Sequence, residues 1–125
     1  MADYKEILNR ATAEASDFTN NPSRMDALLA DLEAKMREIP VIGETVAELP
    51  VMVSLVKSWI KKEYQVSYKV LATMVGAFLY LVKKKDLIPD SIPVIGIADD
   101  VAVLGLALKF VEPDLKAYQE WKAGR

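Results

Sequence analysis

The apolar stretch VLATMVGAFLYLV, residues 70–82, determines how the rest of this 125-residue chain must fold. A helix that is apolar on nearly every side is stable in water only when other elements cover it. The stretch has 13 residues without a charge, whereas a helix that crosses a bilayer needs about 20. It therefore predicts a central buried helix, over about residues 66–84.

Apolar residues at helical spacing also occur on both sides of this stretch. Residues 4–18, 25–39 and 51–62 carry them at intervals of three and four, which is typical of amphipathic helices. After the stretch we expect a helix over about residues 101–111, with Val101, Leu104, Leu106, Leu108 and Val111 as its apolar residues, and a last helix that starts at Glu112-Pro113-Asp114. No segment alternates with a period of two, so a sheet is not expected. The prediction is an all-α fold: one compact domain, residues 1–125, of about five or six helices around a hydrophobic central hairpin.

Three residues have predicted local roles. Ser23, with Asp26 three positions later, fits the N-cap of the second helix. Pro50 suits the first turn of the third helix. Gly105 is expected to let the helix after residue 100 approach the central helix closely.

The composition removes several classes of chemistry. The chain has no cysteine and no histidine, which excludes disulfides, thiolate nucleophiles, imidazole bases and the usual zinc ligands. Its first residues have neither the basic start nor the apolar core of a secretion signal. We expect a cytoplasmic protein, with a peripheral place at the inner membrane surface as the open alternative.

The formal net charge of -2 is distributed unevenly. Residues 1–50 form acidic amphipathic helices, whereas residues 57–85 contain seven basic and one acidic side chain. The lysines that flank the apolar stretch are candidates for contact with an anionic surface; they are Lys57, Lys61, Lys62, Lys83, Lys84 and Lys85. Nucleic acid is not an expected partner, because this block has no arginine and the whole chain is acidic.

A run rich in aspartate and proline, DLIPDSIPVIGIADD, follows the central helix at residues 86–100. Carboxylates on such a turn could bind a divalent cation, and the candidate ligands are Asp86, Asp90, Asp99 and Asp100. The alternative is structural, because Asp99 or Asp100 can cap the next helix and Asp90 suits a turn. The pentapeptide IPVIG occurs at residues 39–43 and again at 92–96, which favours a proline-stiffened connector. We expect no cofactor other than such a cation.

Residues 78–104 resemble the signature of the YkvA-like family, domain of unknown function 1232. The resemblance rests on a hydrophobic helix that ends in tyrosine, an Asp-Leu-Ile-Pro-Asp run, an Ile-Pro-Val-Ile-Gly turn and an Asp-Asp pair. The motif residues are Tyr80, Leu87, Ile88, Pro89, Ile92, Pro93 and Gly96. The resemblance covers about residues 57–115 and implies a small helical protein that is often associated with membranes. It implies no reaction.

Two functions of different classes stay open at this point. The first is a non-enzymatic helical module that binds a protein partner, at the inner membrane surface or in the cytoplasm. The second is a divalent-metal-dependent hydrolase whose site is formed by Asp86, Asp90, Asp99 and Asp100. The sequence does not determine the oligomeric state.

Overall fold

A computed structural model describes residues 4–37, 48–87 and 97–124, and the helices account for most of them. The helices are α1 (Tyr4–Glu14), α2 (Ser16–Thr19), α3 (Pro22–Met36), α5 (Leu49–Ile60), α6 (Tyr68–Leu87) and α7 (Ile97–Ala123). The described ranges contain no strand. The fold is therefore the all-α bundle that the sequence predicts.

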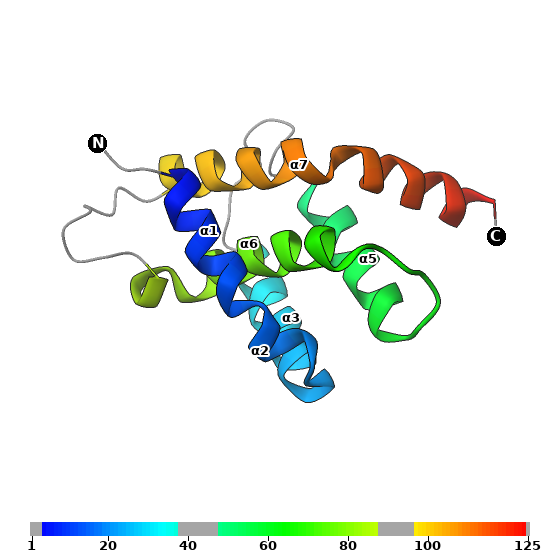
Figure 1. The fold of residues 1–125 in the computed structure, drawn as a ribbon, viewed down its shortest axis with the longest axis horizontal. Helices are drawn as coiled ribbons and strands as arrows, with labels where there is room; N and C mark the ends of the chain where they lie inside the picture. Colours follow the sequence, from blue (N-terminus) through cyan, green and yellow to red (C-terminus); the bar gives the residue numbers. More distant parts are fainter. Residues whose placement is uncertain (1–3, 38–47, 88–96, 125) are drawn as a thin grey trace.

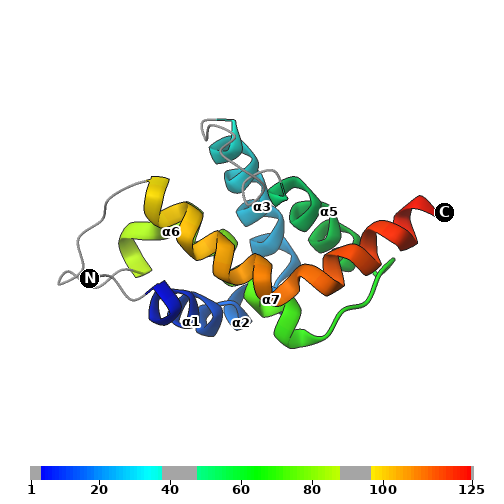
Figure 2. The same ribbon diagram turned by 90° about the horizontal axis from the view of Figure 1, so that it is seen from above.

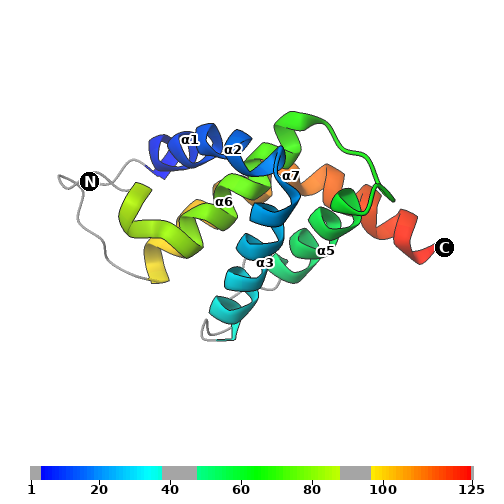
Figure 3. The same cartoon turned by 90° about the horizontal axis from the view of Figure 1, so that it is seen from below.

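Helix α6 is the central element of the bundle, as its composition requires. Every residue from Val70 to Leu81 is buried. Helices α1, α3 and α7 make the most extensive contacts with it, and α2 and α5 add smaller ones; Figure 3 shows α1 and α2 on one side of α6 and α3 crossing it. The apolar stretch at residues 70–82 therefore forms part of the protein core.

Helices α6 and α7 run in opposite directions and pack along one another, as Figure 1 shows. Helix α1 contacts both of them, and seen from above in Figure 2 it lies beside α7. This confirms the predicted hydrophobic hairpin as the centre of the fold.

Helix α7 continues through Pro113, where the sequence predicts the start of a separate helix. A proline inside a helix removes one backbone hydrogen bond and costs about 3 kcal/mol. Burial on both sides of the proline offsets this loss, because the buried residues keep helical spacing across it; they are Leu104, Ala107, Val111, Leu115 and Tyr118. The predicted division into two helices is therefore wrong.

The first residues of α3 and α5 show one local prediction to be wrong and one to be right. Asn21, and not Ser23, is the N-cap of α3, and its side chain accepts a hydrogen bond from the Arg24 backbone N–H at 3.2 Å. Pro22 then occupies the first helical position, which its fixed φ angle favours. Pro50 lies in the first turn of α5 as predicted.

Two helices approach one another closely at Gly76 of α6, which packs against Thr12 of α1. A Cβ atom at position 76 would lie 2.8 Å from the backbone N and Cα of Thr12. The backbone atoms of α1 cannot move aside as the end of a flexible side chain can, so only glycine fits at position 76. Gly105, which the sequence marks for close packing, has no atom within 4 Å of such a Cβ position. The predicted close packing at Gly105 is therefore wrong, and the close approach at Gly76 joins another pair of helices, α1 and α6.

We expect Gly76→Ala to destabilise the fold by about 1–3 kcal/mol, the usual range for overpacking a tight core. The added methyl group must push α1 away from α6, which opens contacts along the whole of α1. Urea denaturation followed by circular dichroism measures the change in the free energy of unfolding.

Gly105→Ala is the matched control, because it adds the same methyl group to a helix in open space. Alanine is favoured over glycine in a helix interior by about 1 kcal/mol, so this variant should be more stable than the parent chain. If both substitutions shift the urea midpoint in the same direction, the close approach at Gly76 is contradicted.

Candidate functional site

Three of the four predicted aspartates lie where α6 ends and where α7 begins. Asp86 is the next-to-last residue of α6, and Asp99 and Asp100 lie in the first turn of α7. Because α7 begins at Ile97, these two residues are inside the helix and do not occupy the N-cap position that the sequence predicts. Asp90 lies outside the described residues.

The resemblance motif is placed only in part. Tyr80 is fully buried in the core, and Leu87 is the last residue of α6. The remaining motif residues lie outside the described ranges: Ile88, Pro89, Ile92, Pro93 and Gly96. Within those ranges no three acidic side chains are grouped so that they could hold a metal ion. The cation site at Asp86, Asp90, Asp99 and Asp100 stays a prediction.

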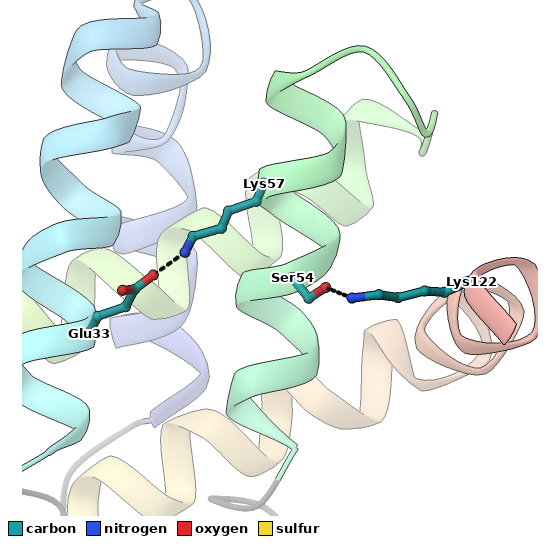
Figure 4. A network of polar contacts seen from close by, with 4 residues as sticks. All are labelled: Glu33, Ser54, Lys57 and Lys122. Atoms are coloured by element: carbon teal, nitrogen blue, oxygen red, sulfur yellow. Dashed lines mark hydrogen bonds and ion pairs between the residues drawn. The ribbon is translucent and has the colours of Figure 1, made fainter. Parts of the chain in front are cut away.

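The predicted lysines separate into different environments. Lys57 of α5 forms an ion pair with Glu33 of α3, which joins the two helices (Figure 4). Lys61 and Lys62 are exposed at the end of α5. Lys83, Lys84 and Lys85 belong to the last turns of α6. The charge of Lys57 is therefore balanced by a neighbour.

A second surface, which the sequence analysis did not identify, combines lysines with exposed apolar side chains. Among the residues whose exposure the structure describes, the large hydrophobic residues with the most exposure are Tyr68, Phe110 and Leu106, at 56%, 44% and 38%. The ammonium of Lys69 lies 5.7 Å from the centre of the Phe110 ring, within the range of a cation–π contact. Lys109 is also exposed. We name Tyr68, Lys69, Leu106, Lys109 and Phe110 the α6–α7 surface.

The geometry of α7 explains why these side chains share one face. Leu106 and Phe110 are four residues apart and Lys109 lies between them, so all three occupy neighbouring positions on the helix surface. The buried stripe of Val103, Ala107 and Val111 faces the other way, toward the core. All of these positions lie within the helix expected over about residues 101–111, but the sequence analysis counted Leu106 among its apolar residues and did not consider Phe110.

A polar cluster connects α5 to α7 at Tyr118. The phenolic oxygen of this buried residue lies 2.6 Å from Ser54 Oγ and 3.0 Å from Ser58 Oγ. The ammonium of Lys122 donates to Ser54 Oγ at 2.8 Å, as Figure 4 shows. Lysine is only a donor, so the Ser54 hydrogen stays available for Tyr118.

This cluster changes the acidity of Tyr118. Burial raises the pKa of Tyr118, whereas hydrogen bonds with Ser54 and Ser58 and the charge of Lys122 lower it; the net pKa lies below its usual value. Tyr64 packs edge-on against Tyr118, with ring centroids 5.1 Å apart. Burial first, and then the charge of Asp114, raises the pKa of Tyr64. The pKa values of two tyrosines in contact are thus shifted in opposite directions.

Comparison with known proteins gives a family match over parts of α6 and α7, and a similar curated protein. Residues 70–106 match the family described as "Protein of unknown function (DUF1232)". A protein of Bacillus subtilis (strain 168), named "Uncharacterized membrane protein YkvA", is 36% identical over 69 residues. The chain is therefore similar to the YkvA-like family. The match with the relative covers 54% of this chain and 65% of the relative's length. No solved structure gave a significant match.

The family match includes residues 78–104, which carry the resemblance seen in the sequence. The description of the family names no reaction. Among the described helices, none is both long enough and apolar enough to cross a membrane.

We expect Lys122→Met to raise the pKa of Tyr118, because the substitution removes a positive charge and the hydrogen bond to Ser54. The absorbance of tyrosinate, recorded as pH increases, measures this pKa, and Tyr118→Phe identifies the transition. Lys116→Met is the control, since Lys116 is exposed on the same helix and pairs with Glu112. An unchanged Tyr118 transition in Lys122→Met would contradict the assigned role of Lys122.

The same shift predicts how stability depends on pH. The pKa of Tyr118 is lower in the folded state than in the unfolded state, so ionisation of Tyr118 stabilises the fold. This stabilisation is complete above the unfolded-state pKa of about 10 and is lost as pH falls through the folded-state pKa. The raised pKa of Tyr64 acts in the opposite direction, since its contribution is lost as pH rises above about 10. Lys122→Met should therefore reduce stability more in the alkaline range than at neutral pH, where only the hydrogen bond to Ser54 is lost. Urea denaturation at neutral and alkaline pH tests this.

Proposed function

We propose that this YkvA-like protein is a non-enzymatic helical module that binds an anionic membrane surface through the α6–α7 surface. The observation that carries the proposal is the position of Lys69 over the Phe110 ring, with the exposed Leu106 and Lys109 on the same face of α7 and the exposed Tyr68 next to Lys69 in the sequence. The relative from Bacillus subtilis is named a membrane protein, which supports the same location for this chain.

The physical basis is a combination of charge and apolar area. A lysine close to a membrane with anionic lipids contributes about 1 kcal/mol of attraction. Aromatic and aliphatic side chains on the same helix face can enter the boundary between headgroups and acyl chains. Tyrosine suits this boundary because its ring is apolar and its hydroxyl is polar.

The burial of α6 favours contact at the surface of the bilayer over insertion of this helix. Its residues from Val70 to Leu81 are buried against α1, α3 and α7. Exposing them to lipid would require these helices to separate and would break the core. The α6–α7 surface needs no such change, because its side chains are exposed in the folded state.

Flotation with vesicles tests the proposal. We expect the protein to float with phosphatidylcholine vesicles that contain phosphatidylglycerol at low salt, and to bind less as salt increases, because salt screens exposed charges. Pure phosphatidylcholine vesicles should bind it weakly. A protein that stays at the bottom of the gradient with the anionic vesicles at low salt would contradict the proposal.

Variants assign the binding to the α6–α7 surface. The pair Lys69→Gln with Lys109→Gln should weaken flotation by about 30-fold, since two contacts of about 1 kcal/mol are lost. Leu106→Ser with Phe110→Ser should weaken it without removing the salt dependence. Lys57→Gln is the matched control, because it removes one positive charge that Glu33 already balances. If the control and the Lys69 and Lys109 variant lose equal binding per charge, only net charge matters and this surface is not the site.

Binding of a protein partner remains the other proposal for this non-enzymatic module. The exposed apolar side chains of the α6–α7 surface would suit such a partner as well. Absence of flotation, together with retention of the fold, would favour this second class.

A further inference from the structure

A cavity of about 360 Å³ lies between the α2–α3 turn and the end of α5. It is separate from the α6–α7 surface, with which it shares no residue. Its lining comprises Thr19, Asn20, Pro22, Met25, Trp59, Ile60, Lys62 and Gln65. A volume of this size suits a small organic molecule.

Much of the cavity lining is apolar. Met25 is fully buried, so this part of the wall belongs to the protein core. Trp59 and Ile60 pack against the core and are only partly buried, and both line the cavity. An apolar ligand body would therefore gain contact with a tryptophan ring and an isoleucine side chain.

The cationic residue of the lining, Lys62, has an unusual backbone conformation. Its φ angle is 62°, and no other described residue except glycine has a positive φ. The Lys62 N–H donates to Trp59 O and the Glu63 N–H donates to Ser58 O, both at 2.9 Å. These two bonds form a Schellman motif, in which the left-handed position is usually glycine.

A lysine at this position is less favourable for the backbone than glycine, because a left-handed conformation strains residues that have a Cβ atom. Strain of this kind is often found at functional sites. Here the strained residue is also the only lysine among the described residues that line the cavity. The two observations, one of the backbone and one of the cavity, point to the same side chain.

We propose that this cavity binds a small carboxylate with an apolar body, such as a medium-chain fatty acid. The Lys62 ammonium pairs with the carboxylate, and the amide of Gln65 donates a second hydrogen bond. Trp59, Ile60 and Met25 contact the apolar body. The Thr19 hydroxyl donates to Ser16 O, which leaves only acceptor positions on its oxygen, so the site suits one anionic group and not two.

Octanoate is the probe, with two matched controls. Acetate has the same carboxylate without the chain, and 1-octanol has the same chain without the charge. Amide and indole resonances are recorded by two-dimensional NMR, and Trp59→Phe distinguishes the indole signal of Trp59 from that of Trp121. We expect octanoate to shift the Trp59 signal in a saturable manner and to leave that of Trp121 unchanged, with acetate and 1-octanol much weaker.

Substitutions of Lys62 separate a binding role from a structural role. Lys62→Ala should raise the Kd for octanoate about 10-fold or more, since a charge-assisted hydrogen bond is lost, whereas Lys62→Arg should retain binding. Lys62→Gly should also lose binding, although its left-handed conformation is unstrained and its thermal midpoint should not fall. Loss of octanoate binding without a lower thermal midpoint cannot arise from unfolding.

The proposal is overturned if octanoate leaves the Trp59 signal unchanged, if 1-octanol shifts it as strongly as octanoate, or if Lys62→Gly binds octanoate as the parent chain does. Flotation with phosphatidylcholine vesicles, with and without oleic acid, distinguishes a free carboxylate from one held in a bilayer. The variant with Lys69→Gln and Lys109→Gln should bind octanoate normally, because the cavity does not depend on the proposed membrane contact.

Discussion

The contact of Gly76 with Thr12 is the constraint on which the rest of the structure depends. A hydrogen atom in place of a side chain lets the backbone of α1 reach that of α6. This brings Ile7, Leu8 and Ala11 of α1 into the core. Because α1 also contacts α7, its position on α6 contributes to the packing of the central pair of helices.

Covering α6 determines which side chains remain outside. Helix α7 directs Val103, Ala107 and Val111 toward the core, so Leu106 and Phe110 must lie on its outer side. A cluster of apolar residues beside Lys69 and Lys109 is then a consequence of the helix period. The cavity at Lys62 has a different origin, because it lies where α5 ends beside the α2–α3 turn.

The sequence predicted the helical class, the central helix and most apolar faces, because these depend on local periodicity. It was wrong where long-range packing decides. Pro113 signals a helix start locally, but the buried stripe on both sides of it keeps α7 continuous. Gly105 and Gly76 look alike in the sequence, and only the partner at Thr12 distinguishes them. The sequence named Lys61 and Lys62 as candidates for contact with an anionic surface, whereas the α6–α7 surface and the left-handed backbone of Lys62 were missed.

By itself the sequence determined that α6 must be buried and that the chain resembles the YkvA-like family, since composition, spacing and motif residues are properties of the chain alone. The tertiary structure decided which lysines are balanced and which residues join the core. Lys57 and Lys62 are five residues apart, yet one pairs with Glu33 of α3 and the other lines a cavity with Trp59. The physical reason is that charge balance and cavity shape depend on neighbours that folding brings from distant parts of the chain.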